Sequence, residues 1–248
     1  MTLRIESLLT VVGLCCNLML LAISPDIRAQ DALPALSRTA TAERLVQNLS
    51  LDNTNYEHGR GSVTWTGTVA SHTDCSGFID HLLMHVDGYK PEDFKRWFGK
   101  DRPKAKHYHD PIAEGTGFSR LMSVAELKTG DLIAIKYLTR TDNTGHIMLV
   151  TEAPQRMSAA PPFVNGTTQW SVTIIDSSES GHGPLDTRHK RGVDGRDHDG
   201  LGRGVFRFYT DPQDKVIGFA WSTNKVARFI APEDEHVELG RLIPGYKP

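Results

Sequence analysis

The chain has 248 residues, enough for one domain with a substantial hydrophobic core or at most two small ones. Its 28 lysines and arginines stand against 30 acidic residues, and the net charge is -2. It therefore lacks the basic field that general nucleic-acid binders use, and we expect one domain with no nucleic-acid partner.

Residues 1–29 have the pattern of a secretory signal peptide. Arg4 supplies the positive end, residues 7–24 are almost wholly apolar, and Ala29 is a small residue of the kind found at cleavage sites. A mature protein would begin near Gln30 and would be secreted or periplasmic. The alternative is a retained anchor, since the apolar run approaches the roughly 18 residues that suggest a spanning helix. Only then would the membrane be a partner.

The cysteines direct attention to Cys75. Cys15 and Cys16 lie within the predicted signal peptide, so cleavage leaves a single thiol and no possible intrachain disulfide. A lone thiol in an exported protein is open to oxidation, and a nucleophilic role is a common reason for its presence. The alternative is a structural role, because free cysteine is among the most buried residue types.

The first half of the mature chain predicts helices and loops. Residues 30–52 predict an N-terminal helical segment with one apolar face. Residues 53–71 are rich in Gly, Thr and Asn and predict a loop that lines a cleft. Residues 91–98 predict another helix, opened by proline and acids. The basic run 100–109 predicts a solvated loop.

A helix that begins at Cys75 is predicted between these segments. Asp74 or Thr73 can cap it, because a short side-chain oxygen accepts from the unpaired N–H groups of a first turn. The positive end of the helix dipole favours the thiolate form of a cysteine placed there. The apolar face comes from residues at helical spacing, namely Phe78, Ile79, Leu82, Leu83 and Val86.

The second half predicts strands, because short runs of β-branched and aromatic residues alternate with Gly, Pro, Asn and Asp. These runs are 131–138, 146–152, 170–177, 204–210 and 216–221. Helices followed by strands indicate an α+β domain, here 53–230, with a mostly antiparallel sheet. The long segment 178–203 predicts a functional or disordered loop, and 231–248 predicts a partly disordered C-terminal tail.

A thiolate nucleophile needs a base and a group that orients the base. His146 opens a predicted strand directly after a turn, a rigid position that can face a helix N-terminus. Asp176 ends the next predicted strand, so it can accept from the histidine ring if the two strands are neighbours. The alternatives are a surface or packing histidine and an aspartate that caps the following loop.

A metal site is the alternative interpretation of the loop 178–203. His182, Asp186, His189 and His198 could supply nitrogen and oxygen ligands. They lack compact ligand spacing and have no cysteine thiolate among them, so we expect solvated loop residues. We therefore expect no metal and no cofactor.

The motif Asp74-Cys75-Ser76-Gly77-Phe78, followed by Gly130-Asp131-Leu132 and then His146, resembles the NlpC-type and CHAP-type cell-wall hydrolases of the papain-like cysteine peptidase superfamily. The similarity covers residues 56–177. It implies a papain-like α+β fold in which the N-terminal helices pack on the sheet.

For the site, the resemblance implies Cys75 as nucleophile, His146 as base and acid, and Asp176 as the third residue. The backbone N–H of Cys75 would hold the oxyanion, helped by Tyr56 or Ser76. The family's aromatic-Gly-Gly approach to the nucleophile is replaced here by Tyr56-Glu57-His58-Gly59.

The expected function is an exported thiol hydrolase that cleaves a peptide or amide bond, with peptidoglycan or a peptide as substrate. Two alternatives remain open. One is a non-catalytic cell-wall-binding module on the same fold. The other is a thiol acyltransferase, in which an amine replaces water in attack on the thioester.

Overall fold

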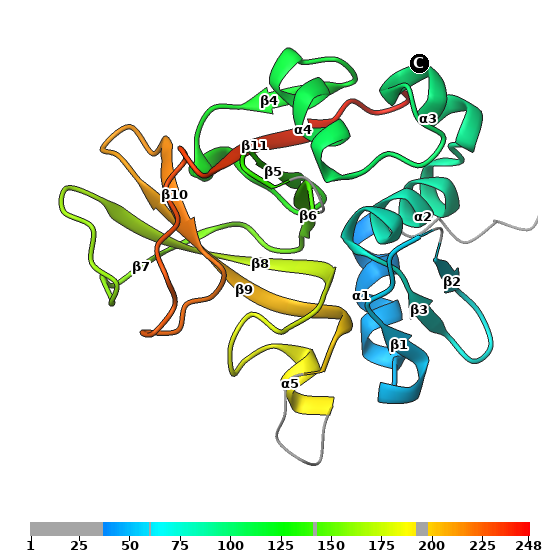
Figure 1. The fold of residues 1–248 in the computed structure, drawn as a ribbon, viewed down its shortest axis with the longest axis horizontal. Helices are drawn as coiled ribbons and strands as arrows, with labels where there is room; N and C mark the ends of the chain where they lie inside the picture. Colours follow the sequence, from blue (N-terminus) through cyan, green and yellow to red (C-terminus); the bar gives the residue numbers. More distant parts are fainter. Residues whose placement is uncertain (1–36, 60, 141–142, 192–197) are drawn as a thin grey trace, which may run out of the picture. The chain divides into compact units, whose positions relative to one another are not determined.

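A strongly curled antiparallel sheet forms the centre of the computed structural model, which describes residues 37–59, 61–140, 143–191 and 198–248 (Figure 1). The strand order is β10-β9-β8-β6-β5-β11-β4, and β7 pairs with β8. The strands are β4 Phe118–Leu121, β5 Leu132–Tyr137, β6 Gly145–Val150, β7 Gln155–Met157, β8 Thr168–Ser178, β9 Gly200–Thr210, β10 Val216–Ala220 and β11 Glu235–Leu242. The five predicted strands all form, each shifted by at most a few residues.

Five helices lie in the described part of the chain, four of them before the first long strand (Figure 1). They are α1 Arg38–Asn48, α2 Cys75–Asp87, α3 Pro91–Phe98, α4 Ala105–Glu114 and α5 Thr187–Arg191. Short 3₁₀ turns occur at Leu51–Asn53 and Val124–Glu126. None of the described helices is both long and apolar enough to cross a lipid bilayer. The predicted signal peptide lies outside the described residues.

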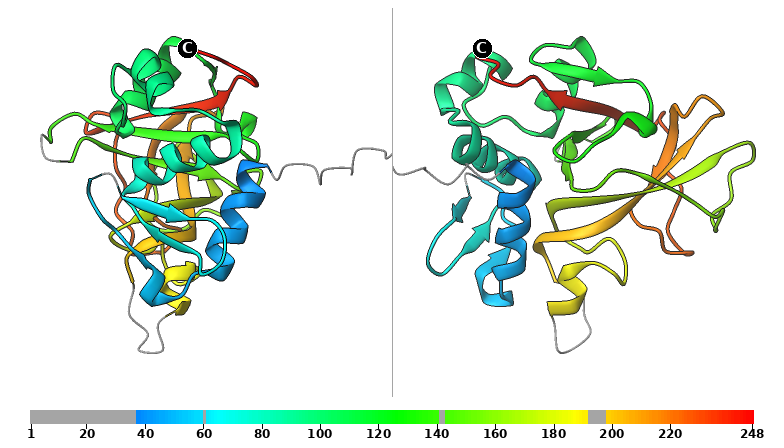
Figure 2. Two further views of the ribbon diagram at one scale, coloured as in Figure 1. Left: turned by 90° about the vertical axis from the view of Figure 1, so that its right-hand side faces the viewer. Right: turned by 180° about the vertical axis from the view of Figure 1, so that it is seen from behind.

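A second, small sheet occupies the stretch that the sequence predicts as a loop. It contains β1 Thr54–Asn55, β2 Ser62–Thr64 and β3 Ala70–His72, with β3 in the middle. Figure 2 shows α1 beside this sheet. Leu201 N, in β9, donates to the Thr54 hydroxyl at 2.9 Å, so the small sheet is tied to the large one.

Alternation of side chains along the strands produces two cores. Ala134 and Ile147 point to the helices and pack with Phe78 of α2. Ile135 and Met148, each one residue further along, point to the other face. That second core is filled by side chains from β8, β9, β10 and β11, so the sheet curls around it. The α+β class predicted from the sequence is confirmed.

The predicted C-terminal tail is instead part of the sheet. Residues 235–242 form β11, which pairs antiparallel with β5 on one side and β4 on the other. Gly240 allows α4 to approach, because a Cβ there would lie 2.7 Å from Ile112. The acidic run before Glu235 is unfavourable for a strand, so the sequence pattern did not predict β11. Residues 35–248 form one compact unit.

The basic run 100–109 is not a loop throughout, because α4 begins at Ala105. Tyr108 is fully buried, and its hydroxyl donates to Asp80 of α2 at 2.5 Å. Pro111 lies inside this helix, and proline in a helix interior is a signal against a helix. Tertiary packing on β5 and β11 therefore outweighed the local pattern.

Candidate active site

Cys75 is the first residue of α2, as the sequence predicts, and Asp74 is its N-cap. The Asp74 carboxylate accepts from Gly77 N at 2.7 Å and from Arg102 Nη2 at 2.5 Å. A Cβ at Gly77 would lie 3.2 Å from Asp74 Oδ1, so glycine suits this tight turn. The N–H of a first-turn residue has no partner within its helix, and the helix dipole favours negative charge there.

A hydrogen bond fixes this helix end against the sheet. Ser177 Oγ, in β8, donates to the carbonyl of Thr73 at 2.5 Å, and both residues are fully buried. Asp176 directly precedes Ser177 in the same strand. The strand that carries the carboxylate is therefore bonded to the residue two positions before the thiol.

His146 lies in β6 and is buried, with 6% of its surface exposed. Its Nε2 lies 2.5 Å from Asp176 Oδ2. Cys75 is close enough for its charge to raise the pKa of His146, and Nδ1 is the ring nitrogen left for the thiol. Gly145 allows the start of β6 to lie close to β5, because a Cβ there would lie 2.1 Å from the carbonyl oxygen of Ile135.

The surroundings of His146 favour its imidazolium form. Burial lowers the pKa, but the negative charge of Cys75 and the bonded carboxylate of Asp176 outweigh it and raise the pKa of His146 to about 10. The ring of Trp221 stands edge-on to His146, with ring centroids 5.2 Å apart. At neutral pH the site therefore holds a proton on the imidazole of His146, beside the sulfur of Cys75.

Asp176 is fully buried and stays ionised. Its burial would raise its pKa, but the positive charges of His182 and Arg188, together with bonds from His146 and His182, hold that pKa well below the usual range. The structure thus places Cys75, His146 and Asp176 in one buried cluster. Strands β6 and β8 are neighbours, which is the condition under which the sequence predicted this contact. The catalytic roles of the three residues stay a prediction.

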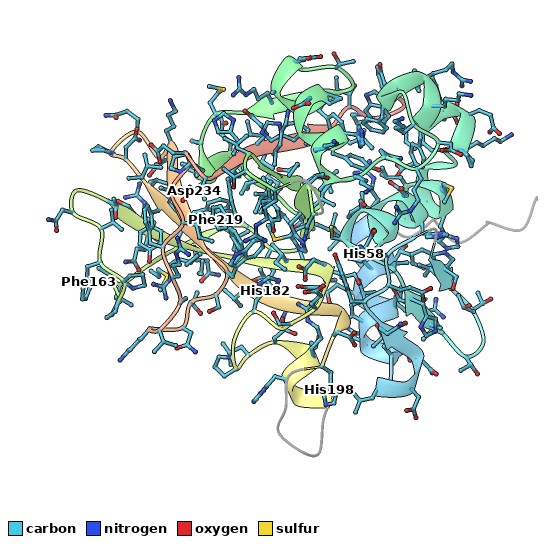
Figure 3. The ribbon with its side chains drawn as sticks, viewed as in Figure 1. His58, Phe163, His182, His198, Phe219 and Asp234 are labelled. Carbon is cyan, nitrogen blue, oxygen red and sulfur yellow. The ribbon has the colours of Figure 1, made fainter. Side chains whose placement is uncertain are left out.

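The segment between β8 and β9 contradicts the prediction of a solvated loop. His182 is 4% exposed, and Asp186 and Arg188 are fully buried. His182 Nε2 lies 2.8 Å from Asp176 Oδ2, and Arg188 Nη2 lies 2.9 Å from Asp176 Oδ1. Figure 3 shows His182 against the β8–β9 pair, with α5 beyond it.

The four residues considered as an alternative metal set are not the group that comes together. Among the described residues, His146, Asp176 and His182 offer three ligand atoms within 4.8 Å of one another. These atoms hydrogen-bond one another, and the guanidinium of Arg188 already neutralises the carboxylate. The arrangement therefore suits shared protons rather than a divalent cation.

The two predicted oxyanion helpers differ in what their hydroxyls do. Both Tyr56 and Ser76 line the pocket that contains Cys75. Ser76 Oγ donates to Asp74 Oδ1 at 3.0 Å, so its single hydrogen points away from an oxyanion. Burial, followed by the charges of Cys75 and Asp74, raises the pKa of the Tyr56 hydroxyl, so it keeps its proton and can donate.

The pocket at Cys75 is a narrow cleft of about 30 Å³ between α2, α4 and the start of β6. It opens to the surface, so the buried sulfur has a path to solvent. Its remaining walls come from His58, Asp74, Lys104, Ala105 and the residues 143–145. Lys104 belongs to the basic run, so this run contributes to the cleft.

Two comparisons with known proteins gave a match to this chain. Residues 60–170 match the NlpC/P60 family, which supports the NlpC-type part of the resemblance and not the CHAP-type part. The chain is also similar to "Uncharacterized protein R653" of Acanthamoeba polyphaga mimivirus, at 34% identity over 221 residues that cover 83% of this chain and 96% of that protein. No solved structure matches. The chain therefore belongs to the NlpC/P60 family, within the papain-like cysteine peptidase superfamily.

Proposed function

We propose that this protein is a cysteine hydrolase that cleaves a peptide or amide bond of peptidoglycan outside the cytoplasm. The observation that carries the hydrolase proposal is the buried contact between Cys75, at the dipole end of α2, and the imidazole of His146, which Asp176 orients. The family match supports a cysteine peptidase or amidase. The signal-peptide pattern of residues 1–29 supports export.

In the first half of the reaction, the thiolate of Cys75 attacks the scissile carbonyl carbon and an S–C bond forms. The carbonyl oxygen becomes an oxyanion, held by the backbone N–H of Cys75 with the hydroxyl of Tyr56 as second donor. The tetrahedral intermediate then expels the amine, which takes the proton of the His146 imidazolium. The products are a thioester on Cys75, a free amine and a neutral imidazole.

In the second half, His146 removes a proton from water, and the resulting hydroxide attacks the thioester carbonyl. The C–S bond breaks and a carboxylic acid leaves, so the thiolate and the imidazolium are restored. Asp176 accepts from His146 Nε2 throughout and keeps Nδ1 directed at the sulfur. The cycle consumes one water and needs no cofactor.

The chemistry of a thiol nucleophile favours the peptide portion of the substrate, because a thiolate attacks the carbonyl carbon of a peptide or amide bond. A glycosidic bond has no carbonyl carbon for it to attack. Peptidoglycan contains both glycan strands and peptides, so we propose that its peptide portion is cut.

The test is digestion of purified peptidoglycan by the chain that begins at Gln30, with mass analysis of the fragments. Paired release of one free amine and one carboxyl group per cut is expected, and Cys75→Ala should release neither. Cross-linked products would instead show acyl transfer, and binding without cleavage would show a wall-binding module. Activity of Cys75→Ala equal to that of the wild type would end the hydrolase proposal.

Export has a separate test. The full chain, expressed in a bacterium with a Sec pathway, is expected in the periplasm or medium with an N-terminus near Gln30. Substitution of the apolar run 7–24 by polar residues should retain the protein in the cytoplasm. An intact N-terminus on a membrane-bound protein would show the retained anchor instead.

A further inference from the structure

The carboxylate of Asp176 is shared by more groups than a catalytic triad requires. Oδ2 accepts from His146 at 2.5 Å and from His182 at 2.8 Å, while Oδ1 accepts from Arg188 Nη2 at 2.9 Å. All four side chains are at most 8% exposed. His182 therefore shares with the base the oxygen Oδ2, and Arg188 binds the other oxygen of the same carboxylate.

His182 is held between two acceptors. Its Nδ1 lies 2.6 Å from the carbonyl oxygen of Trp221, and a carbonyl can only accept, so Nδ1 bears a hydrogen. Its Nε2 faces the carboxylate of Asp176, so Nε2 also bears a hydrogen. A ring with hydrogens on both nitrogens is an imidazolium, and His182 is therefore a second buried cation beside Asp176.

Arg188 uses all of its donors within this cluster. Its Nε and Nη2 bind the two oxygens of Asp186 at 2.9 and 2.8 Å. Its Nη1 binds the backbone carbonyls of Asp176 and Gly200 at 3.2 and 3.0 Å. Asp186 in turn accepts from the backbone N of His182 at 2.9 Å, so one residue ties the arginine to the histidine.

The charges of this cluster balance. Asp176 and Asp186 carry two negative charges, and His182 and Arg188 carry two positive ones. The imidazolium of His146 is bonded to Asp176 and lies beside Cys75, whose negative charge raises the pKa of His146. A buried ion is costly unless it is paired and bonded, and with His182 positive every ion here has a bonded partner.

Two glycines of strand β9 leave space for this cluster. Gly202 lies opposite Asp176 in the β8–β9 ladder, and a Cβ there would lie 2.5 Å from Arg188 Nε. A Cβ at Gly204 would lie 2.3 Å from Asp186 Oδ2 and 2.7 Å from the Cβ of His182. Two alternate residues of one strand thus lack side chains on the face where the cluster sits.

We propose that His182 and Arg188 are positioning residues of the active site, which clamp the ionised carboxylate of Asp176 and thereby set the orientation and proton affinity of His146. The proposal rests on the hydrolase function proposed above only in that Cys75 and His146 form the reactive pair. It assigns a role to the segment between β8 and β9, all of which lies beyond the residues 60–170 that match the family model.

Two aromatic rings and two titratable groups also lie near this cluster and must be kept constant in a test. Trp221 and Phe206 cover His182, at ring centroid distances of 6.0 and 6.4 Å. Tyr137 of β5 lies within electrostatic range of Cys75 and Asp176, and Glu235 of β11 lies within electrostatic range of His146. The variants chosen below leave all four of these residues intact.

The test is the rate of alkylation of Cys75 by iodoacetamide as a function of pH, which needs no substrate. In His182→Gln, the amide still donates to Asp176 but the positive charge is gone. The thiolate and the imidazolium then lose a buried cation nearby, so the pH midpoint of alkylation should rise by about 1 unit. The matched control is His109→Gln, a buried histidine bonded to Asp110. It should keep the wild-type midpoint.

Arg188→Lys is the second variant, and Arg207→Lys is its control. Arg207 is also fully buried, but it binds the carbonyl oxygens of Pro161 and Asn224 rather than a carboxylate. Both substitutions should lower the melting temperature, but only Arg188→Lys should also move the alkylation midpoint. A wild-type midpoint in folded His182→Gln and folded Arg188→Lys would overturn the proposal.

A measurement on the unmodified protein decides the case if the variants do not fold. A ¹⁵N spectrum at pH 7.5 should show His182 with hydrogens on both ring nitrogens. A neutral His182 ring would overturn the proposal. A wild-type Cys75 that iodoacetamide does not alkylate faster than free cysteine would count against the hydrolase function instead.

Discussion

Gly202 lies directly opposite Asp176 in the β8–β9 ladder, and the guanidinium of Arg188 fills the space that a side chain at Gly202 would occupy. The absence of a side chain at Gly202 therefore allows a cation to lie beside the carboxylate of Asp176. A carboxylate buried on a strand needs cations beside it, and the cations need room. The glycine supplies that room, so the orienting acid of a buried thiol–imidazole pair is held ionised inside the fold.

Gly202→Ala tests this connection. The added methyl would overlap Arg188 Nε at 2.5 Å and its Cγ at 2.8 Å, so the arginine must withdraw from Asp176 or the strand must move. We expect a loss of stability of about 1–3 kcal/mol and a fall in turnover that exceeds the loss of folded protein. Thermal unfolding and peptidoglycan digestion measure the two effects. Gly88→Ala, at a helix end open to solvent, should lower stability through its positive φ without a specific loss of turnover.

Cys75→Ala should abolish turnover, with a loss of at least about 10³-fold, because the nucleophile is gone and only binding and the oxyanion donors remain. The fold should persist, since alanine fills most of the space of a small buried thiol. Circular dichroism and hydrolysis assays check both statements. Folded protein with measurable thioester formation would contradict the assignment of this sulfur.

Asp176→Asn should reduce turnover by about 10²–10⁴-fold. An amide can still contact His146, but it no longer favours the imidazolium, and it leaves His182 and Arg188 without their shared anion. The pKa of His146 should therefore fall below the wild-type value of about 10. Histidine NMR titration measures that pKa, and an unchanged value would show that Asp176 does not set it.

The alkaline limit of stability should depend on the pair Cys75 and His146. The folded-state pKa of His146 is raised from 6.5 to about 10. Its favourable contribution to the free energy of unfolding is therefore fully present below about pH 6.5 and is lost as pH rises through about 10. In Cys75→Ala the negative charge that favours the imidazolium is absent, so this loss should begin at lower pH. Melting temperatures measured between pH 6 and pH 11 check it. Identical alkaline profiles for the two proteins would contradict the ion pair.

Asp80 should make the fold less stable as pH rises. Burial raises its pKa well above the usual value of 3.8, although Tyr108 donates to its Oδ1 and Arg102 is nearby. A raised acid pKa means that its favourable contribution holds below about pH 3.8 and is lost as pH rises through the folded-state pKa. Asp80→Asn cannot ionise, so it should gain melting temperature relative to the wild type between pH 4 and pH 8. The exposed Asp52→Asn should show no such trend.

Local pattern was enough for the elements that the thiol and the sheet centre require. Helical spacing after Cys75, a short oxygen at Asp74 and alternating apolar strands are all properties of adjacent residues, so periodicity and capping rules could predict them. The candidate site residues could also be predicted, because Cys75 begins a helix, His146 opens a strand and Asp176 ends the next one. The tail and α4 were mispredicted because Pro111 and the acids before Glu235 are unfavourable locally and are outweighed by packing.

The sequence by itself determined an α+β chain with one candidate nucleophile, a histidine and an aspartate that could meet it. Only the tertiary structure decided that His182, Asp186 and Arg188 leave solvent and surround Asp176. Charge and glycine content made that segment resemble a solvated loop, since local rules assign such residues to water. Their burial depends on pairing with a carboxylate distant along the chain and on the space left by Gly202 and Gly204, and neither is a local property.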